Sequence, residues 1–148
     1  MTTTFKKDGA TLEAAEHAAL HDLMNRVREV FSQQPRSCTS LVDALRRLVD
    51  VVLSHFDHET EENGFFDQVI AHRPGVAHQA AELQREHFDL RSQLFALEQR
   101  AGRASNIDVD WNDLLDRFVA FERQMLRHEL NETDLLQIVY NEDLGRGA

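Results

Sequence analysis

Apolar residues recur at alternating spacings of three and four along most of the chain, as in helices that bury one face. The pattern predicts four helices, over about residues 11–34, 40–71, 76–101 and 110–140. Residues that break helices separate these segments: Pro35, then Pro74 with Gly75, then Gly102. We also expect Asn63 and Gly64 to kink the second helix, because both residues favour turns.

The connections between the four segments are short, so consecutive helices are expected to lie side by side. We therefore predict an all-α fold, an antiparallel up-down-up-down four-helix bundle. With 148 residues the chain has the usual size of one domain, so residues 1–148 are expected to form a single unit. Only two prolines and six glycines occur, which favours long helices over many short strands.

The charge balance narrows the range of partners. The chain has 16 basic and 26 acidic residues, a formal net charge of −10, which repels phosphate backbones and anionic lipid surfaces. We therefore expect neither nucleic acid nor a membrane as a partner. Cys38 is the only cysteine, so no disulfide can form within the chain, and a reducing cytoplasmic location is the simplest expectation.

Histidines and glutamates stand on the apolar stripes where leucine would be expected, and they recur. The pair Glu16–His17 returns 70 residues later as Glu86–His87, and the same offset relates two further positions in each half. This repeat predicts two helical hairpins related by an approximate two-fold axis. The inner polar residues that it selects are His17, His58, Glu62, His87, His128 and Glu132.

The spacing of these residues points to metal binding. His58 and Glu62 are four residues apart, as are His128 and Glu132, so each pair lies on one helical face about one turn apart. Imidazole and carboxylate ligands together suit iron, manganese or zinc. Two buried carboxylates without a cation would be very costly. A lone inner histidine is more often a hydrogen-bonded core residue, but six such residues in two matching sets favour a metal site.

Other polar residues give alternatives. His55 and Glu59 form a competing His-x-x-x-Glu pair, which would shift the site by one turn, although the repeat favours His58 and Glu62. His21 follows His17 by four residues and is a candidate additional ligand. Glu59 and Glu129 are candidates to donate an oxygen or to orient a histidine.

The ordered series H…HExxE…H…HExxE, from about Glu13 to Val139, resembles the hemerythrin-like (HHE cation-binding) domains. The resemblance implies a non-haem centre of two iron ions with an oxo or hydroxo bridge. It also implies bridging by Glu62 and Glu132, with terminal ligands from His17, His58, His87 and His128. The donor types leave manganese or zinc as other metals for the same site.

The resemblance further implies a protein that binds or reacts with O2, NO or peroxide, such as a bacterial oxidoreductase with catalase-like or NO-related activity. Leu83 and Arg91 stand four residues on either side of His87, where the oxygen-carrying hemerythrins have a second histidine. The alternative function is a non-catalytic iron or oxygen sensor, or a metal-binding interaction module. In that case metal occupancy would change the stability of the bundle.

Overall fold

The structure is a computed structural model that describes residues 7–104 and 108–146. The long helices are α1 (Lys7–Ser32), α2 (Cys38–Thr60), α4 (Ala77–Arg103) and α5 (Asp108–Arg146). A short helix, α3 (Phe65–His72), and a 3-10 turn, η1 (Pro74–Val76), join α2 to α4. The described residues contain no strand, so the predicted all-helical class is confirmed.

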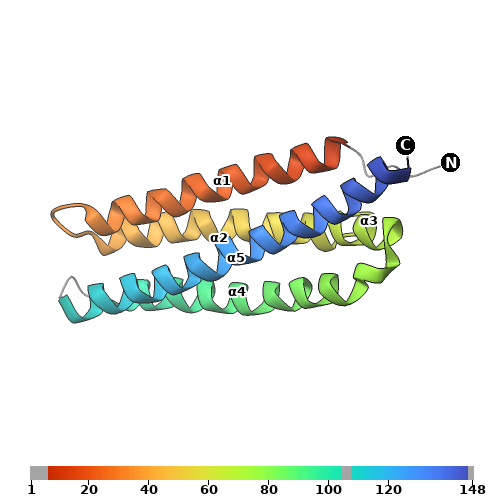
Figure 1. Cartoon of the computed structure of the whole chain (residues 1–148). Helices are drawn as coiled ribbons and strands as arrows, with labels where there is room; N and C mark the ends of the chain where they lie inside the picture. The colour runs from red at the N-terminus through yellow and green to blue at the C-terminus, as the bar shows by residue number, and fades with distance from the viewer. Residues whose placement is uncertain (1–6, 105–107, 147–148) are drawn as a thin grey trace.

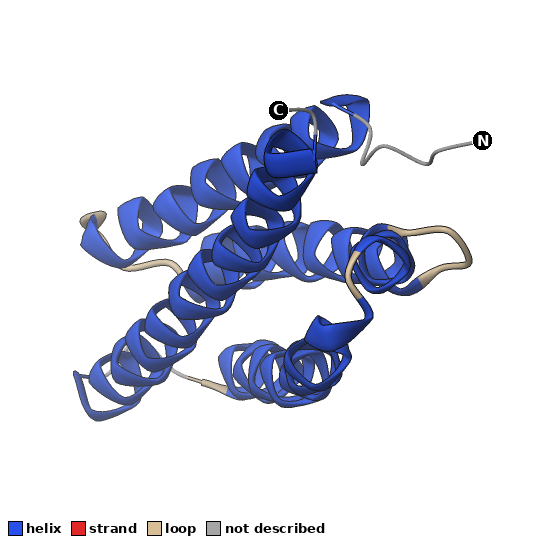
Figure 2. Cartoon of the chain, turned by 45° about the vertical axis from the view of Figure 1, so that its right-hand side comes forward, coloured by secondary structure: helices blue, strands red, loops and turns tan. Residues whose placement is uncertain are grey.

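The four long helices lie side by side in a bundle (Figure 1). α2 packs against α1 and α4, α4 packs against α5, and α5 also contacts α1. The start of α1 and the end of α5 lie at the end of the bundle that carries α3 (Figure 1). Loops are confined to the ends of the helices (Figure 2), so the long helical faces meet in the interior.

The second predicted helix, 40–71, is divided in the structure. α2 ends at Thr60, and α3 begins as a separate helix at Phe65. Asn63 has a positive φ of 61°, a left-handed conformation that asparagine tolerates better than most residues. A Cβ atom on Gly64 would overlap backbone carbonyl oxygens of residues 58 and 61, so the turn needs glycine there. The expected kink is therefore a complete break.

The buried apolar residues form two separate cores. The large core fills the bundle away from α3 and includes Leu20, Leu48, Phe56, Leu94 and Phe118. The small core lies around α3 and includes Phe66, Val69, Leu83, Leu135 and Val139. Each long helix passes between them with a buried or half-buried polar segment, which is the location of the cluster described below.

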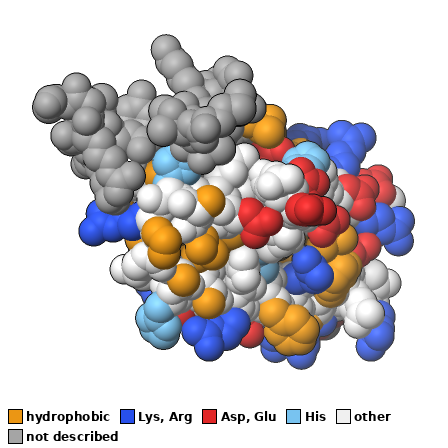
Figure 3. All heavy atoms as spheres, turned by 90° about the vertical axis from the view of Figure 1, so that its right-hand side faces the viewer, with side chains coloured by type: hydrophobic (Ala, Val, Ile, Leu, Met, Phe, Trp, Pro, Cys, Tyr) orange, Lys and Arg blue, Asp and Glu red, His pale blue; other side chains and the backbone are white. Residues whose placement is uncertain are grey.

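The surface at the α3 end mixes acidic, basic and hydrophobic side chains (Figure 3). Among the described residues, no helix combines the length and the apolar character that crossing a bilayer requires.

Candidate metal centre

Seven polar side chains from the four long helices meet between the two cores. Their possible ligand atoms fall into two groups, and within each group these atoms all lie within 4.8 Å of one another. The α1–α2 group consists of Glu13, His17, His55, Glu59 and Glu132. The α4–α5 group consists of Glu59, His87, His128 and Glu132. Glu59 and Glu132 belong to both groups.

Each shared carboxylate lies between one histidine of each group. Glu59 Oε1 is 3.0 Å from His87 Nε2 and 3.4 Å from His55 Nε2. Glu132 Oε1 is 3.4 Å from His128 Nε2 and 3.6 Å from His17 Nε2. The two carboxylates therefore link the halves of the cluster, as bridging ligands of a dinuclear centre would.

Two further carboxylates orient histidines from outside the cluster. The Glu16 carboxylate accepts a hydrogen bond from His55 Nδ1, and Glu86 accepts one from His128 Nδ1 at 2.9 Å. A ring that donates through Nδ1 has its lone pair on Nε2, the arrangement of a metal-binding imidazole. Glu16 and Glu86 therefore direct Nε2 of His55 and His128 into the cluster.

The atoms that face the centre of the cluster have no hydrogen-bond partner among the described residues. They are buried, and they comprise Nε2 of His17, His55, His87 and His128 and both carboxylate oxygens of Glu59 and Glu132. Buried polar atoms in folded proteins are nearly always paired. A bound cation would satisfy the imidazole nitrogens and the carboxylate oxygens together, so the residues present fit a metal.

Comparison with known proteins agrees with this geometry. The family model of the hemerythrin HHE cation-binding domain matches residues 8–137. The chain belongs to the hemerythrin HHE cation-binding family. No curated protein and no solved structure gives a significant match. The family resemblance seen in the sequence is therefore confirmed, and this HHE domain carries a buried His/Glu cluster suited to a metal cation.

The shared carboxylates of the HHE domain have opposite proton affinities when no metal is bound. Burial raises the pKa of Glu59 far above its usual range, and the adjacent Glu132 raises it further. Burial would also raise the pKa of Glu132, but the hydrogen bonds with Glu59 and His17 outweigh it and hold that pKa at about 2. Two such close carboxylates cannot both be charged without a cation, so in the metal-free domain Glu59 carries the proton.

Two of the histidines also differ. Burial lowers the pKa of His87 to about 3, and the neighbouring His128 adds to this shift. Burial would lower the pKa of His17 as well, but the hydrogen bonds with Glu13 and Glu132 outweigh it and raise that pKa to about 10. Since a metal binds the unprotonated ring, it must displace a proton from His17 but not from His87.

Four of the six residues that the sequence selected, His17, His87, His128 and Glu132, lie in the cluster. The structure does not bring His58 and Glu62 to it. The His58 side chain is 47% exposed and its Nδ1 lies 2.5 Å from a Glu16 oxygen, while Glu62 is exposed beyond the end of α2. The competing pair, His55 and Glu59, occupies the inner positions instead.

The two hairpins differ in length, which explains the shift. His87 follows His17 by 70 residues, but His128 follows His55 by 73. The difference arises mainly in the second helix of each hairpin, because 20 residues separate Asp108 from His128 whereas 17 separate Cys38 from His55. An offset of 70 therefore aligns α1 with α4 correctly and misaligns α2 with α5 by about one turn.

The remaining candidates, His21 and Glu129, lie beside the cluster and outside both groups. His21 Nε2 is 2.5 Å from Glu129 Oε2, and this contact joins α1 to α5. The His21 side chain is 47% exposed, whereas Glu129 is buried.

Sequence reasoning missed three residues at the cluster. Glu13 belongs to the α1–α2 group, and its signal was the four-residue spacing before His17. Glu16 and Glu86 orient histidines of the following helices. Their signal was the repeated Glu-His pair, in which the histidine drew attention and the preceding glutamate did not.

Two hollows border the cluster at Glu13. The α1–α5 groove, of about 370 Å³, is lined by residues that include Glu13, His17, Glu132, Ala14, Ala18 and His21. The α1–α3 groove, of about 230 Å³, lies between α1 and the turn before α3, and its lining includes Glu13, His58, Glu61 and Gly64.

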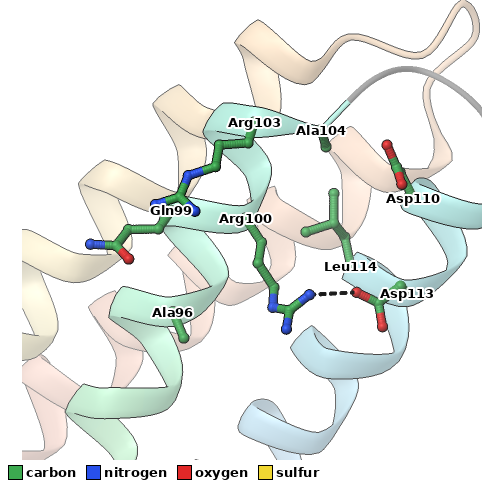
Figure 4. A pocket seen from close by; sticks show the side chains of 8 residues that line it. All are labelled: Ala96, Gln99, Arg100, Arg103, Ala104, Asp110, Asp113 and Leu114. Atoms are coloured by element: carbon green, nitrogen blue, oxygen red, sulfur yellow. Dashed lines mark ion pairs between the residues drawn. The ribbon is translucent and has the colours of Figure 1, made fainter.

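Two other hollows are lined by none of the seven cluster residues. One, of about 230 Å³ between α4 and α5, is bordered by Leu83 and Glu86. The other, of about 430 Å³, lies where α4 ends and α5 begins, and there Arg100 pairs with Asp113 at 3.6 Å (Figure 4). The α1–α5 groove is therefore the hollow of these four that reaches the most cluster side chains.

Proposed function

We propose that the cluster holds two iron ions, one in each group of ligands. The α1–α2 group would bind one ion through His17, His55 and Glu13, and the α4–α5 group would bind the other through His87 and His128. Glu59 and Glu132 would bridge them. The observation that carries this proposal is that both carboxylates belong to both groups, with their buried oxygens unpaired.

This proposal replaces His58 and Glu62 as ligands by His55 and Glu59. His58 keeps a supporting role, because Glu16 contacts both His55 and His58 through its two oxygens. The repeat is part of the proposal in its corrected form: two up-down hairpins related by an approximate two-fold axis. The matching outer contacts, Glu16 to His55 and Glu86 to His128, support it.

We propose iron because histidine and carboxylate ligands suit ions that change oxidation state, although manganese and zinc accept the same donors. Two iron ions would supply an open coordination position and the electrons to bind or transform O2, NO or peroxide. The protein side chains bind the ions, keep the centre dry between two apolar cores and leave the α1–α5 groove for access. The proposed activity is that of a di-iron oxidoreductase.

A sensor function is the second candidate, and one observation favours it. The cluster takes residues from all four long helices, so loss of the metal would leave unpaired carboxylates in the centre of the bundle. Metal binding then contributes directly to folding free energy. The turn before α3 begins at residue 61, two residues after Glu59, where a partner protein would detect a change in order.

Metal content and turnover, measured together, test both candidates. We expect about two iron ions per chain after expression in iron-containing medium. An oxidoreductase consumes peroxide or NO over many turnovers, and His128→Ala abolishes this. His78→Ala is the matched control, because His78 is exposed and pairs with Glu82 away from the cluster. Single-turnover chemistry with a large metal-dependent change in protease sensitivity would favour the sensor, whereas one ion or none per chain would contradict the dinuclear centre.

A further inference from the structure

Glu13 breaks the symmetry of the cluster. The residue that corresponds to it in the second hairpin, 70 positions later, is Leu83, which is buried in the small core. One half of the centre therefore has a third protein ligand that the other half lacks. This ligand comes from the solvent side of α1, next to two grooves.

The contacts of Glu13 are looser than those of the shared carboxylates. Its Oε2 atom lies 3.3 Å from His17 Nε2 and 4.0 Å from His55 Nε2. This oxygen is buried without a hydrogen-bond partner among the described residues, yet the side chain as a whole is 12% exposed. Glu59, by comparison, is completely buried. Glu13 therefore has one end at the cluster and an edge in contact with solvent.

The grooves on both sides of Glu13 give it somewhere to move. The α1–α5 groove reaches His17 and Glu132 past the small side chains of Ala14 and Ala18. The α1–α3 groove lies on the other side and has room for a displaced carboxylate. Glu13 is the one residue that lines both.

The other half of the centre is closed by aromatic rings. Phe56 stacks on His87 with 3.8 Å between ring centroids and 8° between ring planes, and Phe66 lies 5.5 Å from the same ring. Neither His87 nor His128 lines any of the four hollows described above. A small molecule therefore reaches the centre more directly at His17 than at His87.

We propose that Glu13 is a displaceable cap on the α1–α2 group. It occupies that half of the centre at rest, and a small ligand that enters along the α1–α5 groove takes its place while the carboxylate moves toward the α1–α3 groove. The inference rests on the proposed dinuclear centre. It predicts that Glu13 competes with added ligands and is not needed to hold the metal.

Azide binding to the metal-loaded protein tests the cap. Azide is a three-atom anion whose binding to iron is followed by its absorption band, without turnover. We expect Glu13→Ala to keep about two metals per chain and to bind azide about tenfold more tightly, because a cap that is in place about nine-tenths of the time lowers apparent affinity by that factor. Glu61→Ala is the matched control, since Glu61 lines the α1–α3 groove but lies outside both ligand groups, and it leaves azide affinity unchanged.

The outcomes separate the cap from the centre itself. Equal or weaker azide binding by Glu13→Ala overturns the cap while the dinuclear centre stands, and so does loss of a metal ion from this variant. Fewer than two ions in the wild-type protein overturns the proposed function, and the cap with it. Glu13→Gln, which keeps the side-chain length, gives the same comparison if the alanine variant folds poorly.

Discussion

The Glu86 carboxylate accepts a hydrogen bond from His128 Nδ1 at 2.9 Å, and this nitrogen lies on the opposite side of the ring from Nε2, which faces the cluster. Glu16 has the same relation to His55 in the other hairpin. The two contacts lock both rings in the tautomer and orientation that a metal requires. In each hairpin, the glutamate of the Glu-His pair therefore supports the histidine of the next helix.

Removal of Glu86 should weaken metal binding without removing a ligand. We expect Glu86→Ala to lower metal affinity about 10- to 100-fold, the usual effect of losing such a supporting carboxylate. Competition with a chelator of known affinity measures this. Glu82→Ala is the control, because Glu82 is exposed one turn earlier and pairs with His78. Equal affinities in the two variants would show that Glu86 does not orient His128.

The metal-free protein should lose stability as the pH rises from about 6 to 10. The folded-state pKa of His17 is raised to about 10, so its stabilising contribution is complete below the unfolded value near 6.5 and disappears as the pH approaches 10. Glu59 acts in the same direction, because its raised pKa favours the folded state only while the carboxyl is protonated.

Thermal unfolding measured across this pH range checks the expectation. The melting temperature of the metal-free protein should fall by several degrees, whereas the metal-loaded protein should hold its value, since metal ligands bind in their unprotonated forms. A melting temperature that rises with pH in the metal-free protein would contradict the proton assignments at His17 and Glu59.

The turn after α2 gives a prediction on stability. A Cβ atom at Gly64 would overlap the carbonyl oxygens of residues 58 and 61. We expect Gly64→Ala to lower the free energy of unfolding by about 1–3 kcal/mol. Gly102→Ala is the opposite case, because Gly102 lies in α4 with open space around it. It should stabilise the protein by about 0.5–1 kcal/mol. Urea unfolding measures both, and equal effects would mean that the turn relaxes around a side chain.

The helical class and most of the inner polar positions follow from the sequence. Long segments with strong periodicity determine which residues face inward, and His17, His87 and His128 lie on such segments. The family also follows, because six spaced polar residues make a specific pattern. The structure brings these parts together as the sequence indicates.

The position of the site on α2 could not be fixed in the same way. His55 is buried on one face, and the face continues either three residues on to His58 or four residues on to Glu59, since both spacings occur in helices. The repeat favoured His58, but the second helices of the two hairpins are out of step by three residues. Glu13 was missed because one glutamate before a histidine is also common on solvated helix faces.

The most direct test of the account compares two glutamates three residues apart. Metal per chain should be about two in the wild-type protein and in Glu62→Ala, because Glu62 is exposed beyond the end of α2. It should fall to about one or less in Glu59→Ala and in Glu59→Gln, because the Glu59 carboxylate belongs to both ligand groups. Two ions retained without the Glu59 carboxylate, with loss on removal of the Glu62 carboxylate, would contradict the proposed centre.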